Sequence, residues 1–456
     1  MRTSMQFLNS VLVTFLLTVW ALQIDAQGVL KVPEQYANIS QAVAGAHEGD
    51  TILIAQGTYQ GTGFRLIEID KSLTIAGEYL YTKNLPDAAR TIIDCGGTNK
   101  EAFTVTGGSG VCAKFIGLSI TGFIGEEFDR GAIRIIGSNA IFQSCLFLDN
   151  SAVAYPAWGF EGTAISIKDS SQVKFYNCLF ADNIGAAIGV NDTKLHHPDG
   201  KQGLPPRIYV TACTFANNTD CGIALNDSGN ETVPELFVSN SMFISNGNYG
   251  ISGEYEGKSP NHVYQVRNCL FYGNSSGRVN GYYFEPEIFK TIDTNSLGIN
   301  LDSFGNFTTI PNFKPDSLAD YPYQYAYNSP NVNTGSTDTF DVDNSITDIG
   351  FGNIKKFFDL ECDYESLIAS IENARSGTSE SIRIYPNPSS DHVFIDGISK
   401  GQHQSLVNIR TISGQLVMEM NYAPEGIDVQ HLKPGIYLIT VTSNDRIRTQ
   451  RLVIQH

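Results

Sequence analysis

Cys145-Leu-Phe147-Leu-Asp-Asn150 is the first of five copies of one motif, Cys-x-Phe-x-x-Asn, in which Ser replaces Cys once. The later copies are Cys178-Leu-Phe180-Ala-Asp-Asn183, Cys213-Thr-Phe215-Ala-Asn-Asn218, Ser241-Met-Phe243-Ile-Ser-Asn246 and Cys269-Leu-Phe271-Tyr-Gly-Asn274. Successive Phe positions lie 33, 35, 28 and 28 residues apart, so the unit keeps a roughly constant length with insertions. A motif that returns at this spacing is typical of a stacked repeat.

Each repeat consists of short strand-like segments. Apolar residues alternate along 173–175 and again along 178–180, and the polar pair Tyr176-Asn177 separates the two runs. A period of two indicates strands. A further apolar strand follows most motif Asn residues, as in Gly131-Ala-Ile133-Arg-Ile135. Three short strands without a helix bury their inward faces only by coiling and stacking, so the sequence predicts a parallel β-helix, right-handed by the usual chirality of such connections.

Stacking gives the repeated positions separate roles. We expect an internal aromatic stack, in which each ring contributes about 1.5–3 kcal/mol of burial; its members are Phe147, Phe180, Phe215, Phe243 and Phe271. The residue just before the Cys position is expected to need a left-handed backbone and to carry an amide that bonds its copy one rung away. We interpret the asparagines at this position as structural; they are Asn177, Asn240 and Asn268.

This pattern resembles the right-handed β-helix fold of the pectate lyase superfamily, in which such ladders are usual. The resemblance concerns the fold of residues 27–365 and is far less specific for activity. The Asn-Thr-Asp, Asp-Asp and Arg-Ile-Lys motifs of polygalacturonase-like chains do not occur in the rungs. The calcium ligands and basic residue of pectate lyases cannot be placed from spacing. Asp149, Asp182 and Asp220 lie near equivalent corners, where a turn role is the simpler interpretation, so catalytic and metal-binding residues stay unknown.

The N-terminal residues predict export. Residues 1–26 combine Arg2, an apolar run from Val11 to Leu22 and the small residue Ala26, which is typical of a secretory signal peptide. No second long apolar run follows, so we expect no transmembrane span after signal removal. The net charge of −17 argues against nucleic acid and anionic surfaces as partners. A polyanionic substrate would need a bridging cation or a local basic patch.

A short helix is expected to cap the coil. Ile39, Ala42, Val43 and Ala46 fall on one helical face, and a strand follows at 51–55. This opening resembles that of many β-helix proteins, including pectin methylesterase-like ones. A cap is needed because open strand edges recruit other chains. We therefore interpret Asp50 and Tyr59 as cap residues.

Insertions between the strands fall at two corners and predict two walls of loops, where function is most often carried. The first wall comprises residues 123–130 and 151–161, and the second comprises residues 191–207, 226–235 and 253–262. Aromatic rings beside carboxylates are typical of sugar binding, although they also fold a loop onto its coil. The adjacent histidines of the second wall suit a metal ligand or a base, or a solvated loop. The candidate carbohydrate contacts are Glu126, Asp129, Arg130, Tyr155, Trp158, Glu161, Lys194, His196, His197 and Arg207.

The eight cysteines fit the stack. Four occupy one column, where neighbours about 4.8 Å apart with parallel side chains match a disulfide torsion poorly. We expect buried thiols there. Cys95 with Cys112 is the best disulfide candidate.

The C-terminal residues predict a closing segment, a linker and a second domain. Ser329 to Gly335 and Thr347 to Gly350 resemble the segment that closes many secreted bacterial β-helices, and residues 366–381 are a polar linker. Residues 382–456 alternate as in a small β-sandwich. Tyr385-Pro-Asn-Pro388, Gly414-Gln-Leu-Val417 and Pro434-Gly-Ile-Tyr437 resemble the type A C-terminal sorting domain of the Bacteroidota type IX secretion system. The resemblance implies that this domain is an export address and that the secretion machinery is a partner.

The expected protein is all-β, secreted or exposed on the outer cell surface, and it binds or processes a polysaccharide. If it is an enzyme, a polysaccharide lyase or a glycoside hydrolase is expected. The alternative is a non-catalytic surface or adhesion rod. No cofactor is evident; Ca²⁺ is possible at the acidic stretch 338–348, where solvated turns are the simpler interpretation.

Overall fold

The fold is taken from a computed structural model, in which the chain divides into two units, Met1–Cys362 and Asp363–His456. The structure describes residues 27–125, 131–152, 162–192, 205–227, 234–254, 264–280, 293–294, 300–301, 305–315, 319–326, 329–332, 349–352, 383–385, 389, 391–396, 406–411, 416–421, 426–433, 435–443 and 446–454. The predicted signal peptide and linker lie outside these residues.

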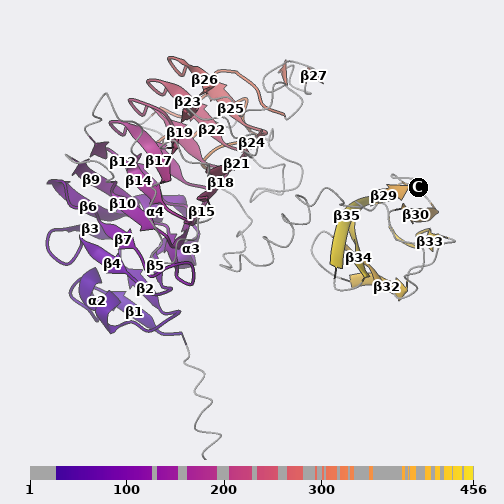
Figure 1. Cartoon of the computed structure of the whole chain (residues 1–456), viewed down its shortest axis with the longest axis horizontal. Coiled ribbons are helices and arrows are strands. Elements are labelled where there is room, and N and C mark those ends of the chain that lie inside the picture. Colours follow the sequence, from indigo (N-terminus) through magenta and orange to yellow (C-terminus); the bar gives the residue numbers. More distant parts are fainter. Residues whose placement is uncertain are drawn as a thin grey trace, which may run out of the picture. The chain divides into compact units, whose positions relative to one another are not determined.

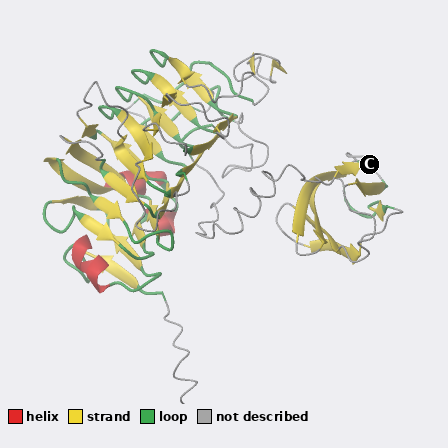
Figure 2. Ribbon diagram, viewed as in Figure 1, coloured by secondary structure: helices red, strands yellow, loops and turns green. Residues whose placement is uncertain are grey.

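The first unit is a coil of three parallel sheets (Figures 1 and 2). Sheet A contains β1 (Val29–Val32), β2 (Thr51–Ile54), β5 (Thr74–Gly77), β8 (Cys112–Ile116), β11 (Asn139–Gln143), β15 (Gln172–Tyr176), β18 (Arg207–Thr211), β21 (Glu235–Ser239) and β24 (Tyr264–Arg267). Sheet B contains β3 (Gly57–Gln60), β6 (Thr91–Thr98), β9 (Ser119–Gly125), β12 (Leu146–Leu148), β16 (Leu179–Ala181), β19 (Thr214–Ala216), β22 (Met242–Ile244) and β25 (Leu270–Tyr272), and β13 (Ser151–Ala152) pairs with β9. Sheet C contains β4 (Ile67–Ile69), β7 (Phe103–Val105), β10 (Ile133–Ile136), β14 (Gly162–Lys168), β17 (Ala186–Asp192), β20 (Ile223–Asp227), β23 (Tyr249–Glu254) and β26 (Gly277–Asn280). The predicted parallel β-helix is confirmed, and from β2 onward each rung contributes one strand to each sheet, whereas β1 adds a strand to sheet A alone.

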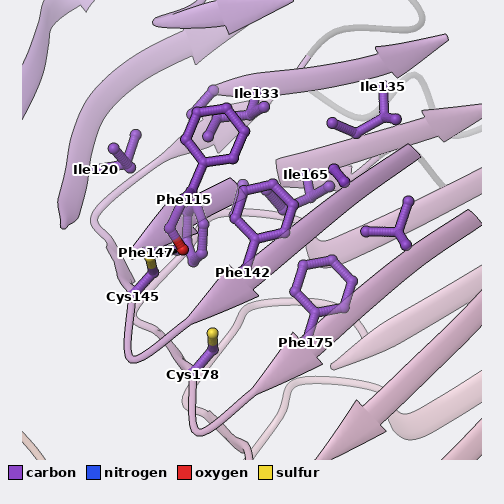
Figure 3. Close-up of a cluster of buried hydrophobic side chains, with 14 of the residues drawn as sticks. Phe115, Ile120, Ile133, Ile135, Phe142, Cys145, Phe147, Ile165, Phe175 and Cys178 are labelled. Carbon is purple, nitrogen blue, oxygen red and sulfur yellow. Dashed lines mark hydrogen bonds between the residues drawn. The ribbon is translucent and has the colours of Figure 1, made fainter. Parts of the chain in front are cut away.

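Aromatic side chains fill the coil in two columns. The motif Phe residues of sheet B pair in register from Phe147 to Phe271 and stack with ring centroids 4.8 Å apart. Beside them Phe115, Phe142 and Phe175 of sheet A stack at 4.9 and 5.0 Å (Figure 3). The two columns meet edge to face, as in the Phe142 and Phe147 pair at 72°. Both arrangements are favoured by the ring quadrupole, so the columns fix the rungs in register.

The cysteine column lies beside the motif Phe residues. Cys145 and Cys178 stand one above the other (Figure 3), and both are buried thiols. The expected Cys95–Cys112 disulfide is wrong, because Cys95 is a buried free thiol. Cys112 does form a disulfide, and its partner lies outside the described residues. Burial raises the pKa of the Cys95 thiol to about 12, because the thiolate would lose its hydration.

The turn between sheets A and B requires a left-handed backbone, as expected. Asn177, Asn240 and Asn268 have φ of 52°, 48° and 52°, and Ala212 at the equivalent position has 55°. The expected ladder of amides does not run through this column, because Ala212 interrupts it. The Asn177 Nδ2 instead donates to the Ser144 hydroxyl of the preceding rung, at 3.1 Å.

Helix α2 (Ile39–Gly45) provides the predicted N-terminal cap. Ile39, Ala42 and Val43 are buried against the first rungs, and the Asn38 side chain accepts from the Gln41 N–H at the helix start. The Asp50 carboxylate connects the turn before β2 to the residue that precedes β1. It accepts the backbone N–H groups of His47 at 2.8 Å and of Gly28 at 2.6 Å.

We predict that Asp50 makes the cap sensitive to acid. The hydrogen bonds from the His47 and Gly28 amides lower the pKa of the carboxyl despite its burial. Its stabilisation is therefore present above the unfolded pKa of about 3.9 and lost as the pH falls through the lower folded value. When the pH is lowered from about 6 to about 2, the free energy of unfolding of the wild type should fall by about 1–2 kcal/mol more than that of the Asp50→Asn variant. Urea unfolding at each pH measures this, and equal losses in both proteins would contradict it.

The outer face of sheet B is also apolar, and two parts of the chain cover it. Helices α3 (Tyr79–Thr82) and α4 (Leu85–Arg90) pack on its early strands. A segment that we call the strap, residues 305–315, 319–326, 329–332 and 349–352, packs on the later ones. Its last residues run back along the rungs, where the N–H groups of Gly350, Phe351 and Gly352 donate to Asn240 O, Thr214 Oγ1 and Asn177 Oδ1. The predicted closing segment thus lies along the side of the coil.

We predict that Tyr323 fastens the strap. Its hydroxyl contacts both carboxylate oxygens of Asp182, at 3.0 and 3.1 Å, and burial with the nearby carboxylate raises its pKa, so it remains a neutral donor. Tyr323→Phe should destabilise the strap by about 1–2 kcal/mol and speed amide hydrogen exchange in 319–326 and 349–352. Exchange in strand β2 serves as the control. Unchanged exchange in the strap would contradict this role.

The described residues of the second unit form two antiparallel sheets. One contains β29 (Arg383–Tyr385), β30 (His392–Asp396) and β33 (Ile427–Asp428). The other contains β31 (Leu406–Thr411), β32 (Leu416–Asn421), β34 (Gly435–Ser443) and β35 (Arg446–Ile454). Val393, Ile409, Val441 and Leu452 belong to its separate core. The small antiparallel β domain expected after the linker is therefore present.

Candidate functional site

A groove of about 650 Å³ lies at the corner between sheets B and C. It is lined by Ser151, Ala152, Ile184, Gly185, Thr219, Asp220, Gly247, Asn248 and Ser276. These residues come from five successive rungs, and in each rung they follow the motif Asn by one or two positions. Because equivalent corners of a coil stack above one another, the groove runs parallel to the coil axis.

A ladder of asparagine amides forms the wall behind the groove. The Nδ2 of each motif Asn donates to the Oδ1 of the next, at 3.2 Å from Asn150 to Asn183 and 2.8 Å from Asn183 to Asn218. The ladder continues at 2.9 Å to Asn246 and 2.8 Å to Asn274. The second hydrogen of each Nδ2 bonds a main-chain carbonyl, as from Asn218 to Phe180 O. The first four asparagines are fully buried with their amides satisfied, so the residues that follow them are held rigidly.

Main-chain hydrogen bonds continue this order into the groove itself. The N–H groups of Asp220, Asn248 and Ser276 donate to the carbonyl of the rung before, at Gly185, Asp220 and Asn248. Gly247 is needed here, since a Cβ would lie 2.1 Å from the Thr219 carbonyl oxygen. The groove floor is therefore a continuous ladder with one step per rung, about 4.8 Å high.

The side chains in the groove are polar and largely uncharged. Thr219 Oγ1 accepts the Gly185 N–H at 2.9 Å, which leaves its own proton available for donation. Asp220 Oδ1 accepts from Asn248 Nδ2 at 3.1 Å, and Oδ2 has no hydrogen bond to the described residues. Ile184 is 55% exposed and provides an apolar surface one rung from Thr219. The groove thus offers hydroxyl, amide and carboxylate groups beside an aliphatic surface.

Most of the candidate contacts expected from the sequence lie outside the described residues. These are Glu126, Asp129, Arg130, Tyr155, Trp158, Glu161, Lys194, His196 and His197. In the sequence, residues 153–161 follow Ala152, which lines the groove, and residues 126–130 follow Gly125, which pairs with Ala152. Their role as carbohydrate contacts stays a prediction.

Arg207 lies on the outer face of sheet A, at a different position from the groove. It is 5% exposed, and its Nε lies 2.8 Å from Oε2 of the buried Glu235 on the next rung, off the line of the N–H bond. The neighbouring Tyr209 and Phe237 stack on each other at 4.9 Å. Arg207 thus forms an ion pair on the outer face of sheet A. The rings of Tyr209 and Phe237 stack on each other, so the faces turned toward one another are not available to a sugar.

Sequence reasoning did not find the groove residues. Asp220 was noted as a turn carboxylate, but Asp149 and Asp182 lie before the amide ladder with φ of 54° and 58°, whereas Asp220 lies after it. The usable signal was a polar or small residue one or two positions after each motif Asn. Within the described parts of the chain, no group of three or more His, Cys, Asp or Glu side chains is placed to hold a metal ion.

Comparisons with known proteins agree with both units. Residues 87–252 match the family model described as the right handed beta helix region, and residues 383–455 match the secretion system C-terminal sorting domain. A crystal structure of the pectate lyase Pel9A is similar, with 14% identity, a TM-score of 0.29 and coverage of 73% of this chain and 98% of that chain. At those values the likeness carries no argument about activity. No curated protein matches the sequence.

The C-terminal match indicates that the protein is exported. Sorting domains of this family direct export through the type IX secretion system, as the sequence blocks in residues 385–437 indicated. None of the helices in the described residues is both long and apolar enough to cross a membrane. The chain is therefore a secreted or cell-surface protein in which a right-handed parallel β-helix precedes a C-terminal sorting domain of the type IX secretion system.

Proposed function

We propose that the β-helix binds a polysaccharide outside the cell and that the groove beside the asparagine ladder is its binding site. One observation supports this most strongly: five successive rungs contribute lining residues at the same corner, in one line along the axis, and four of them present a polar side chain there. A ligand that repeats along its length can use such a line repeatedly. Binding sites for small molecules lack this periodic construction and are usually enclosed.

The chemistry of the groove also suits a polysaccharide. Sugar hydroxyls need partners that both donate and accept, which Thr219, Asn248 and Ser276 provide. The carboxylate of Asp220 accepts from a hydroxyl more strongly than a neutral group does. The exposed Ile184 can cover the C–H face of a sugar ring. The rigid ladder behind these groups reduces the entropy lost on binding.

A surface rod without a ligand is the second candidate. The stacked aromatic columns and the amide ladder make the coil stiff, which is what a rod or adhesion protein needs. A stiff coil alone gives no reason for a groove lined by exposed hydroxyls. The two functions therefore differ in whether the purified protein retains a glycan.

Affinity electrophoresis of the purified full chain through gels that contain single polysaccharides tests the proposal. Each polysaccharide is run with and without calcium, and the products are analysed: unsaturated ends indicate a lyase and new reducing ends a hydrolase. Retardation by at least one polysaccharide is expected. If no polysaccharide of the panel retards the protein and none yields products, the polysaccharide proposal is wrong and the non-catalytic surface rod is the remaining candidate.

Adjacent serines provide a matched pair of variants. Ser275 and Ser276 are both exposed, but only Ser276 lines the groove. Ser276→Trp should therefore weaken glycan binding by about tenfold or more, because the indole fills one end of the groove. Ser275→Trp should bind as wild type does. Equal binding by both variants would contradict the assignment of the site.

A further inference from the structure

We infer that the groove takes an uncharged polysaccharide in an extended conformation, laid along the coil axis with about one sugar unit per rung. The inference rests on the proposed function and specifies its substrate class. Three features of the groove support this inference: its charge, its straight course and the spacing between its rungs.

The charge of the groove disfavours acidic glycans. Its one titratable side chain among the described lining residues is the carboxylate of Asp220, and no lysine, arginine or histidine is among them. The whole chain has a net charge of −17. A uronate polymer would therefore meet repulsion without a cation to offset it.

The geometry of the groove favours an extended chain. Parallel pairing keeps sheet C in unbroken register just beyond the groove from Ile188 to Val279, so the last four of the five rungs repeat without a shift. The first rung pairs with the second inside the groove through the bridge between Ser151 and Ile184, and the register of β14 and β17 shifts only farther along, between Gly162 and Ile165. The lining residues therefore follow a straight line with steps of about 4.8 Å. This step is close to the length of one pyranose unit in a straight 1,4-linked chain. A helical glycan such as a maltodextrin would turn away from the line after one or two units.

The number of rungs limits the useful length of the ligand. Five rungs contribute lining residues, from Ser151 in the first to Ser276 in the last. Each added sugar unit should strengthen binding until about five units occupy the groove, because each rung adds lining residues that the next unit can contact. Longer chains should gain little more.

Isothermal titration of the full chain with defined oligosaccharides tests the inference. The probes are cellohexaose, xylohexaose and mannohexaose as straight neutral chains, maltohexaose as a curved neutral chain and hexagalacturonate as an acidic one. At least one straight neutral hexasaccharide should bind at least tenfold more tightly than maltohexaose and hexagalacturonate do. When oligosaccharides of that same sugar are lengthened from dimer to octamer, their affinity should level off near five units. Preferential binding of hexagalacturonate or maltohexaose would overturn the inference while the proposed function stands. Binding of none of the probes, together with no retardation by any polysaccharide, would overturn both.

Substitution of Asp220 tests the charge argument separately. Asp220→Asn keeps the shape of the side chain but removes its charge, so the straight neutral chain should bind about tenfold more weakly and the discrimination against hexagalacturonate should shrink. Asp70→Asn makes the same change in net charge at an exposed turn that does not line the groove, and it should leave both values unchanged. Equal effects of the two substitutions would show that only net charge matters and would overturn the role of Asp220.

Discussion

Replacement of Asn218 by alanine is expected to lower the free energy of unfolding by about 3–5 kcal/mol. Asn218 is fully buried, and its Nδ2 donates to Asn246 Oδ1 at 2.9 Å and to Phe180 O at 3.1 Å. Its Oδ1 accepts from both the side chain and the backbone N–H of Asn183. Alanine removes all of these side-chain hydrogen bonds from their buried partners and opens a cavity between two rungs. Urea unfolding of the full chain, followed through the first unit, measures the loss.

The neighbouring Asn217 provides the control. It is exposed, its φ of 53° suits glycine, and its side chain bonds Asp182 outside the coil. Asn217→Gly should therefore change the free energy of unfolding by less than about 1 kcal/mol. If Asn218→Ala cost no more than Asn217→Gly, the amide ladder would not be a main source of stability.

Replacement of Phe215 by alanine should have a similar effect, about 3–5 kcal/mol, through loss of packing. The Phe215 ring is fully buried between Phe180 and Phe243, with centroids 4.8 Å away on each side and planes within 2°. Neither neighbouring ring can move into the space, because each is held by the next rung. Phe215→Leu, which retains most of the volume, should cost about 1–2 kcal/mol.

An exposed aromatic residue on the same sheet tests whether burial is the cause. Tyr272 of β25 is 38% exposed and directly follows the last Phe of the column. Tyr272→Ala should cost less than about 1 kcal/mol in the same urea experiment. Equal losses from Phe215→Ala and Tyr272→Ala would contradict the buried column.

The coil could be predicted because its signals repeat. The motif Phe returns at the same place in each unit, and only stacking buries five such rings together, so the positions of Phe147 to Phe271 followed from spacing. Helix α2 was also predictable, since four apolar positions on one face precede a strand. These features depend on local period and composition, which one sequence contains.

Features that depend on side-chain direction or distant contacts were not predictable. Three of the five units contain asparagines at two turns. Spacing does not reveal that the motif Asn points inward, whereas Asn177 lies at a turn whose equivalent position in the next unit is Ala212. The strap meets sheet B through residues far apart in sequence, such as Phe351 and Thr214. The disulfide of Cys112 was missed for the same reason, because pairing depends on contacts that spacing does not show.

The groove was missed because no single residue marks it. Serine, threonine and glycine at 151, 185, 219 and 276 are ordinary turn residues, and they line one groove only because successive rungs place them in line. Loops with aromatic and charged residues drew attention instead, since residue type is visible in a sequence and alignment along an axis is not.

A crystal structure of the full chain with the tightest-binding straight neutral oligosaccharide tests the central claim most directly. The account predicts sugar rings along the corner between sheets B and C, parallel to the coil axis, with hydroxyls within about 3 Å of Thr219 Oγ1 and Asp220 Oδ2. Sugar bound on the outer face of sheet A beside Tyr209 and Phe237, or lying across the rungs, would contradict it.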